Sequence, residues 1–196
     1  MFSIEPIAPN RLMPLLATAS LAPTVMFTLQ PIAKDLENTS DETIAAIEAE
    51  PWPEYELGDR NPDITAAEHL LVEHGFDPHP NEDTPGEFDD HTEAAVLNYQ
   101  EANNLHTDGE LNSQTWELLR EQTFGEYGPG TSGPVGKAIQ TLLNAKFQAH
   151  ISDDGEYGET TRAVVHEAQE HFEIHADGIV GEVTWRALVT YQDHDR

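Results

Sequence analysis

The sequence predicts an all-α protein in which two tandem three-helix modules follow an extended, partly apolar N-terminal arm. Three observations predict this fold class. The 196-residue chain repeats itself at a nearly constant offset after Trp52. Apolar residues within each copy recur at helical spacing between Pro, Gly, Asp and Asn, and no segment alternates apolar and polar residues long enough to indicate a strand. A run of low charge, interrupted by prolines, precedes the repeats.

The charge balance excludes several classes of partner. Thirty-seven Asp and Glu residues against nine Lys and Arg residues give a formal net charge of −28. No basic face is left to neutralise phosphates, so we expect no nucleic acid partner. Such acidity is typical of halophilic proteins, because salt screens their self-repulsion. Cysteine is absent, which excludes disulfides, thiolate zinc sites and cysteine nucleophiles.

Residues 1–50 form a separate N-terminal segment in this prediction. The stretch Leu12–Phe27 is almost entirely apolar or small, but two prolines interrupt it and it is too short to span a membrane. It has two interpretations: a cleaved secretory signal with a cleavage site at Ala17–Ala19, or a retained arm that docks on the protein or on a partner. Ser40 then caps one short helix, TIAAIEA, because acidic residues follow it in the first turn.

An internal repeat organises the rest of the chain. From Gly86 onward, many residues meet the identical residue 69 positions later, and upstream the offset is 72. The three-residue difference lies in the proline-rich stretch Asp77–Gly86, where a loop insertion is tolerated. The two halves are therefore predicted to be duplicated modules, at residues 54–121 and 126–190.

Each module is predicted to contain three short helices, at 62–74, 90–103 and 113–119 in the first copy and at 134–145, 159–172 and 182–188 in the second. A proline opens the first helix of each copy, which suits the first helical position. The third helix buries one tryptophan and one leucine, and a threonine in its first turn can reach the free amides there. We expect both tryptophans to be buried in separate, superposable cores. The residues of this predicted repeat core are Trp116, Leu119, Trp185, Leu188, Thr115 and Thr184.

The second and third helices of each module open alike, with Thr three residues after Asp, Asn or Gly. The first residue of each motif is predicted to cap the helix or to turn the chain. Asp89, Asn104 and Asn112 occupy positions that suit glycine, and Asp and Asn are the side chains that best tolerate a left-handed turn. We therefore expect left-handed backbone at these three residues.

The repeated motif resembles a known family. It reads Asp-Gly, aromatic-Gly-x-x-Thr, an apolar segment ending in Gln, and then Asp-Gly-x-apolar-Gly-x-x-Thr-Trp-x-x-Leu. The second copy carries it in Gly155, Tyr157, Gly158, Thr161, Val165, Gln169, Asp177, Gly178, Val180, Gly181, Thr184, Trp185 and Leu188. The first copy carries Phe88, Thr92, Val96, Tyr99, Gln100, Leu105, Asp108, Gly109, Thr115, Trp116 and Leu119. Over about two-thirds of the chain, this pattern resembles the peptidoglycan-binding module of bacterial cell-wall hydrolases, a compact three-helix domain. Pro85, Ala168 and Glu173 depart from it.

No motif in the sequence predicts an enzyme. The ten histidines suggest a metal site, but His166 and His171 are five residues apart, about 140° around a helix, and do not share a face for zinc. No nucleophile elbow or phosphate loop is present, and no segment outside the repeats is large enough for a catalytic domain. We predict no catalytic residues, no metal and no cofactor.

Six polar or aromatic residues are candidates for ligand binding. Gln100, Asn103, Asn104 and Gln169 lie at the ends of the second helices, where they can bond to the amides of a stem peptide. Gln100 and Gln169 have an equally good alternative, which is to bond to loop backbone. Tyr55 and Tyr127 lie where the chain enters each module, and their rings can stack on sugars.

The resemblance implies a non-catalytic protein that binds the glycan or the stem peptide of peptidoglycan, outside the cell or in its envelope. Two alternatives stay open. In the first, residues 1–50 dock the protein into a larger assembly, such as a phage or injection-system particle, with the modules on the particle surface. In the second, the protein is a targeting subunit for a separate wall hydrolase. The wall chemotype is also open, and the acidity allows a haloarchaeal host without peptidoglycan.

Overall fold

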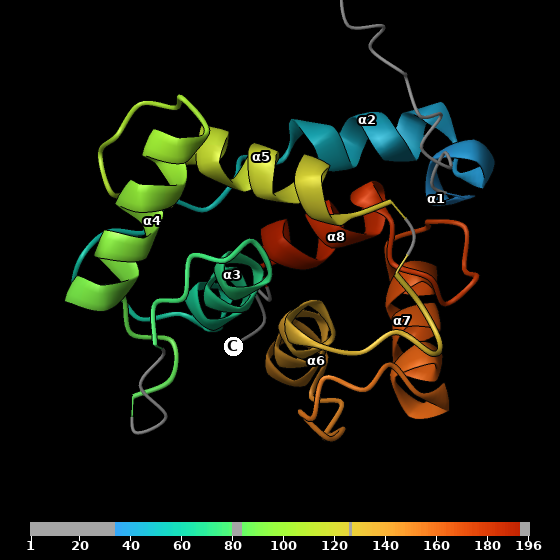
Figure 1. Ribbon diagram of the computed structural model, residues 1–196. Helices are drawn as coiled ribbons and strands as arrows, with labels where there is room; N and C mark the ends of the chain where they lie inside the picture. The colour runs from blue at the N-terminus through green and yellow to red at the C-terminus, as the bar shows by residue number, and fades with distance from the viewer. Residues whose placement is uncertain (1–33, 80–83, 126, 193–196) are drawn as a thin grey trace, which may run out of the picture.

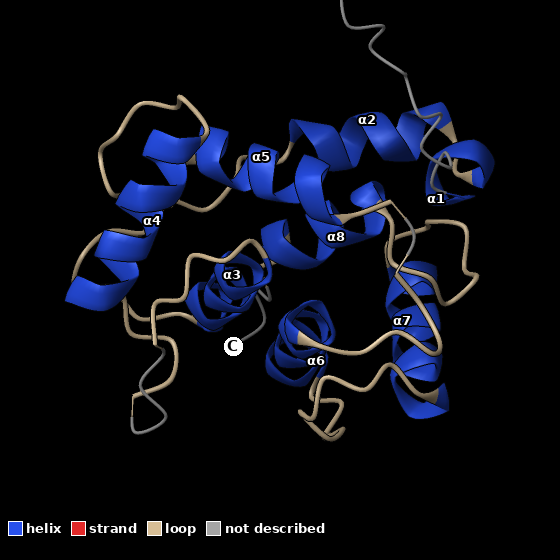
Figure 2. Ribbon diagram, in the orientation of Figure 1, coloured by secondary structure: helices blue, strands red, loops and turns tan. Residues whose placement is uncertain are grey.

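The computed structural model describes residues 34–79, 84–125 and 127–192, which form eight helices and no strand. Figures 1 and 2 show these helices and the loops between them. The all-α prediction is confirmed. The stretch Leu12–Phe27 lies outside the described residues. The helices are α1 (Lys34–Asn38), α2 (Asp41–Ala49), α3 (Pro62–Glu73), α4 (Asp90–Ala102), α5 (Ser113–Thr123), α6 (Pro134–Phe147), α7 (Glu159–His171) and α8 (Glu182–Thr190).

Helices α3 to α5 form the first copy of the repeat (module 1), and α6 to α8 form the second (module 2). All six begin where the sequence predicts, but the third helix of each module is longer than expected. Helix α5 continues to Thr123 and α8 to Thr190. No glycine or proline stops α5 after Leu119, and the Phe124 amide still donates to the Arg120 carbonyl at 2.9 Å.

Short backbone bridges close both modules at equivalent positions. Tyr55 pairs with Leu111 and Arg60 with Glu87 in module 1. Their counterparts in module 2 pair Tyr127 with Val180 and Ser132 with Glu156. The duplication therefore extends to the irregular backbone and not only to the helices.

The prediction of left-handed backbone is right at one residue and wrong at two. Asn104 has a φ of 58°. Asp89 and Asn112 have φ values of −97° and −87° because they are helix N-caps, a position that requires extended backbone. Each accepts hydrogen bonds from two first-turn amides.

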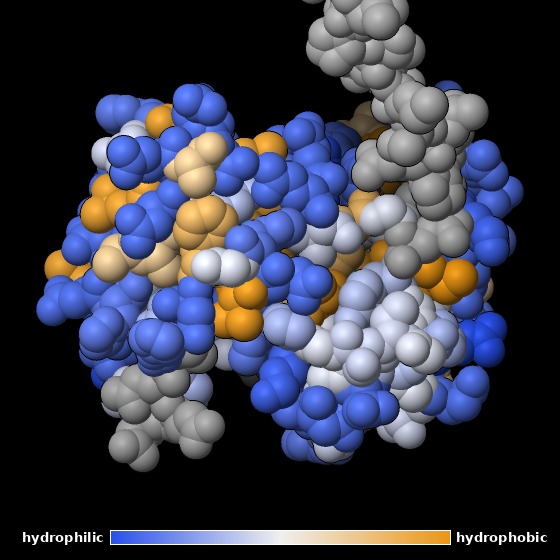
Figure 3. All heavy atoms as spheres, viewed as in Figure 1, coloured by the Kyte–Doolittle hydropathy of each residue, from blue (hydrophilic) through white to orange (hydrophobic). Residues whose placement is uncertain are grey.

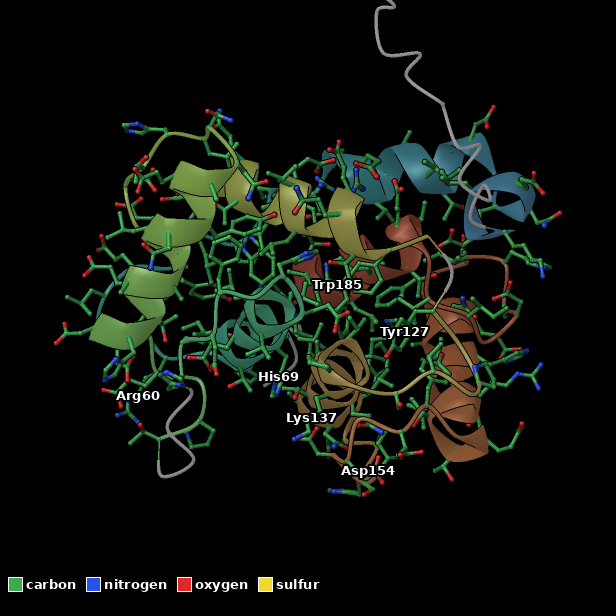
Figure 4. All side chains as sticks on the ribbon, in the orientation of Figure 1. Arg60, His69, Tyr127, Lys137, Asp154 and Trp185 are labelled. Atoms are coloured by element: carbon green, nitrogen blue, oxygen red, sulfur yellow. The ribbon has the colours of Figure 1, made fainter. Side chains whose placement is uncertain are left out.

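A stacked aromatic pair fills the centre of each module. The ring centroids of Trp116 and Trp52 are 5.9 Å apart, with an angle of 7° between the ring planes. Those of Trp185 and Phe124 are 4.4 Å apart, with an angle of 18°. Both tryptophans of the predicted core are fully buried, and Figure 4 shows Trp185 near the middle of the molecule. The Trp116 indole donates to the carbonyl of Pro53 at 2.9 Å. Leu119, Leu188, Thr115 and Thr184 are also fully buried.

The two cores are not separate, which corrects the sequence-based expectation. Helices α3 and α6 occupy equivalent positions in the two modules, and they pack on each other (Figure 1). Helices α5 and α8 do the same. Buried residues of both modules, including Leu70 of α3 and Ile139 of α6, therefore form one continuous apolar cluster. The sequence repeat predicts each module, but it does not indicate through which helices the two modules pack on each other.

A buried ion pair crosses this shared face. The Lys146 ammonium of α6 lies 2.8 Å from a carboxylate oxygen of Asp63 in α3, and the Tyr55 hydroxyl donates to the other oxygen at 2.8 Å. Burial raises the pKa of Asp63 and lowers that of Lys146, while the attraction between the two opposes both shifts. The pair therefore ties module 1 to module 2 at a fixed register.

Residues 34–50 are part of the folded body. Asp35, which is 2 % exposed, accepts hydrogen bonds from the backbone amide and the hydroxyl of Thr184, both at 3.0 Å, and so caps the N-terminus of α8. Thr39 accepts from the His175 amide at 3.0 Å. Gly181 leaves room for the Asp35 carboxylate, because a Cβ at this position would lie 2.2 Å from one of its oxygens.

Helix α2 lies where the sequence predicts a helix, and α1 is a second helix that the sequence analysis did not predict. Ile44 and Ile47 of α2 pack on a small apolar cluster of Ile174, Val183 and Ala187. The Arg186 guanidinium of α8 donates to the last carbonyls of α2, those of Ile47, Glu48 and Glu50. The segment from Lys34 onward therefore docks on α8 of its own chain.

The surface charge predicts a stability that depends on salt. Figure 3 shows a face covered mostly by hydrophilic residues, and the net charge is −28. We expect the melting temperature to rise between about 0.01 M and about 1 M sodium chloride, because the Debye length falls from about 30 Å to about 3 Å and screens the repulsion. Scanning calorimetry measures this, and potassium chloride should give the same rise. A flat or falling melting temperature contradicts the prediction.

Candidate functional site

A buried glutamine holds a loop in place in module 1. The Gln100 side chain, which is fully buried, accepts from the amides of Asp108 and Gly109 at 3.1 and 2.9 Å. Its amide nitrogen donates to the Glu110 carbonyl and to the Thr115 hydroxyl, both at 3.0 Å. All of these partners are groups of the same chain. This agrees with the alternative in which Gln100 bonds to its own loop rather than to a ligand.

The same arrangement recurs twice in module 2. Gln169 accepts from the Gly178 amide at 2.8 Å and donates to the Ile179 carbonyl at 2.8 Å. Gln140, which the sequence analysis did not single out, accepts from the Gly155 amide at 2.7 Å. Each glutamine also lies within hydrogen-bond distance of the threonine that opens the next helix. We call this arrangement the glutamine lock.

Glu68 takes the place of glutamine in the fourth lock. It lies 72 residues before Gln140, is 3 % exposed, and accepts from the Thr92 hydroxyl at 2.6 Å. Burial raises the pKa of Glu68 to about 7. Pro85 stands where the lock of Gln140 has Asp154, so no second carboxylate repels Glu68 from that position. Aligning the repeats at this offset would have identified the exchange from the sequence.

Replacing Glu68→Gln is expected to stabilise the protein at high pH. The folded-state pKa of about 7 lies above the ordinary 4.5, so the free energy of unfolding falls as pH rises from about 4.5 to about 7. The variant has no carboxylate to ionise at position 68, so its free energy of unfolding does not fall for this reason. We expect it to match the wild type near pH 4.5 and to exceed it by about 1–3 kcal/mol at pH 8. Urea unfolding across this pH range measures the difference, and a difference that does not change with pH would contradict the assignment.

The other predicted ligand-binding residues occupy different environments. Asn103 donates to the Tyr99 carbonyl at 2.8 Å and accepts from Gln122, so its amide is engaged by the protein. The Tyr55 hydroxyl is bonded to Asp63. The Tyr127 hydroxyl is buried with no hydrogen-bond partner among the described residues, because Val135 replaces that aspartate in module 2. The structure thus does not bring the six residues together.

Asn104 is the one of these six that lines a large open groove at α5. This groove has a volume of about 860 Å³, and we call it the α5 groove. Its walls come from α5, from the loop after α4, from the end of α2 with the residues that follow it, and from Arg186 of α8. The lining residues are Glu48, Trp52, Asn104, Leu105, His106, Ser113, Gln114, Glu117, Leu118, Glu121 and Arg186.

Most charges at one wall of the α5 groove are neutralised within the protein. Glu48 and Glu117 both form ion pairs with Arg120 and Arg186. Glu121 is exposed and forms no ion pair within the described part of the chain. The groove therefore presents one carboxylate that is free to meet a cationic group.

A second hollow of about 530 Å³ lies between α3 and α6. Polar side chains line it, including Arg60, Asn61, Thr141, Asn144 and Asp153. Asn144 is engaged twice with the backbone of Ile151. None of the six predicted ligand-binding residues lines this hollow.

Residues 34–79, 84–125 and 127–192 contain neither a cluster of metal-ligating side chains nor a membrane-spanning helix. These residues hold no group of three or more His, Asp or Glu side chains placed to bind a metal ion. They also contain no helix that is long and apolar enough to cross a membrane.

Fold and loops together define a tandem-repeat helical protein: two three-helix modules whose loops are held by buried Gln and Glu side chains, with an open groove on the first. A family model described as a putative peptidoglycan binding domain matches residues 60–119 and 132–188. Together the two matches cover more than half of the chain, and the protein belongs to this family. A comparison with curated proteins found no match.

Proposed function

We propose that this protein binds peptidoglycan through its folded modules and has no catalytic activity of its own. The observation that carries the proposal is the tandem match to a peptidoglycan-binding domain. The structural roles of several buried polar groups support the non-catalytic part. Asp35 caps α8, Asp63 pairs with Lys146, and the glutamines hold loops. We place the protein outside the cell or in its envelope, where peptidoglycan lies.

The two alternatives make different use of the N-terminal segment. Residues 34–50 are engaged with α8 of the same chain, so docking into a larger particle would fall to residues 1–33. A targeting role would add a hydrolase as a further partner. The salt-dependent stability expected above would fit a halophilic source for any of these functions.

Sedimentation with purified sacculi tests the proposal. We expect the full chain to pellet with bacterial sacculi at both low and high salt, and the turbidity of the sacculi to stay constant. Staying in the supernatant at every salt concentration would overturn peptidoglycan binding. Clearing of the suspension by the protein alone would overturn the non-catalytic part.

A further inference from the structure

The α5 groove has an exact counterpart in the repeat, and the two differ in what covers them. Every lining residue that module 1 contributes has an equivalent 69 positions later. Asn104, Leu105 and His106 correspond to Glu173, Ile174 and His175. Ser113, Gln114, Glu117, Leu118 and Glu121 correspond to Glu182, Val183, Arg186, Ala187 and Thr190.

In module 2 this face is filled by the chain itself. Val183, Arg186, Ala187 and Thr190 are all buried. Helices α1 and α2 cover them through the Asp35 cap, the contact of Thr39 with the His175 amide, and the packing of Ile44 and Ile47. The groove on α8 thus holds a peptide segment that crosses it from end to end.

In module 1 the equivalent face is open. Ser113, Gln114 and Glu121 are exposed, and Leu105 and Leu118 are partly exposed. The N-terminus of α5 also needs no foreign cap, because Asn112 accepts hydrogen bonds from its first-turn amides. Module 2 has Gly181 at that position, and so relies on Asp35.

We propose that the α5 groove is the single ligand site of this protein and that it takes a peptide with a free amino group. This inference rests on the proposed function, under which the ligand is the stem peptide of peptidoglycan. The equivalent groove on α8 of module 2 is covered by α1 and α2 of the same chain. The protein then binds one stem peptide per chain, although it carries two modules.

The lining of the groove favours a peptide over a glycan. Its one tryptophan, Trp52, is 8 % exposed, stacks on Trp116 and lies under the Arg186 guanidinium at 4.4 Å, so neither face of its indole is left for a sugar. Leu105 and Leu118 offer a surface for small apolar side chains. Asn104 and Gln114 offer amide donors and acceptors to a peptide backbone.

The charge of the groove favours an amine on that peptide. Glu121 is the lining carboxylate without an ion pair among the described residues. A diamino acid in the stem presents a primary ammonium, which is a charge-assisted donor to such a carboxylate.

Calorimetric titration of the full chain with a synthetic stem peptide that contains lysine tests the inference. We expect one site per chain. Glu121→Gln should weaken binding about five- to tenfold, and acetylation of the lysine amine should have the same effect. Gln114→Trp should fill the groove and abolish binding. Glu101→Gln makes the same chemical change on an exposed residue of α4 and should leave the affinity unchanged.

Several results would overturn the inference: two sites per chain, no binding of the stem peptide, binding of peptide-free glycan chains instead, or groove variants that bind like the wild type. The melting temperatures of Glu121→Gln and Gln114→Trp must match the wild type, and if Gln114→Trp is destabilised, Glu121→Gln decides. Sedimentation with sacculi distinguishes a failure of this inference from a failure of the proposed function. If the wild type and both groove variants pellet equally, the site is wrong and the function stands.

Discussion

Deletion of residues 1–50 is expected to cost about 4–6 kcal/mol of stability, a large part of the roughly 5–15 kcal/mol of a typical domain. The deletion exposes Ile174 and Val183 to water and removes the Asp35 cap from α8. The conformational entropy that the shortened chain recovers offsets part of the loss. Urea unfolding followed by circular dichroism measures the change.

Deletion of residues 1–33 alone is the matched control, since it keeps the contacts of Asp35, Thr39 and Ile47. The difference between the two truncated proteins isolates the contribution of α1 and α2. Equal stabilities would contradict the view that this segment is part of the folded body. Residues 1–50 were predicted to form one arm that docks on the protein or on a partner, and residues 34–50 dock on α8 of the same chain.

Replacement of Trp116→Ala is expected to cost about 3–5 kcal/mol, because it leaves a large cavity beside Trp52 and removes the hydrogen bond to Pro53. Because one apolar cluster spans both modules, we expect a single unfolding transition that moves as a whole. Far-UV circular dichroism and tryptophan fluorescence should report the same midpoint.

Leu57→Ala serves as the control for this variant. Leu57 is 50 % exposed, so its truncation should change the stability by no more than about 0.5 kcal/mol. Two separate transitions in Trp116→Ala, with only one of them shifted, would show that the modules unfold independently and would contradict the continuous core.

Local signals predicted the helices well and the docking of α1 and α2 poorly. Pro62, Asp89 and Asn112 start helices because φ restriction and side-chain capping act within a few residues. The contact of Asp35 with Thr184 joins residues 149 positions apart, and no local pattern encodes it. The one trace in the sequence is Gly181, which replaces the capping Asn112 of the first copy.

For the candidate site, too, local features could be predicted from the sequence and long-range contacts could not. Gln100 and Gln169 were found as polar residues at helix ends, yet only the folded structure shows that loops already occupy their hydrogen-bonding groups. Glu121 was missed, because a single exposed glutamate in an acidic chain carries no local signal. What distinguishes Glu121 is that no segment within the described residues covers its face of module 1, whereas α1 and α2 cover the equivalent face of module 2.

Glu117 and Arg186 are equivalent residues of the two modules, and they face each other at 3.4 Å across the contact between α5 and α8. Two copies of module 1 joined in the same way would oppose Glu117 to Glu117, and two copies of module 2 would oppose Arg186 to Arg186. Like charges at that spacing repel, so this contact favours the pairing of module 1 with module 2 over the pairing of either module with a copy of itself.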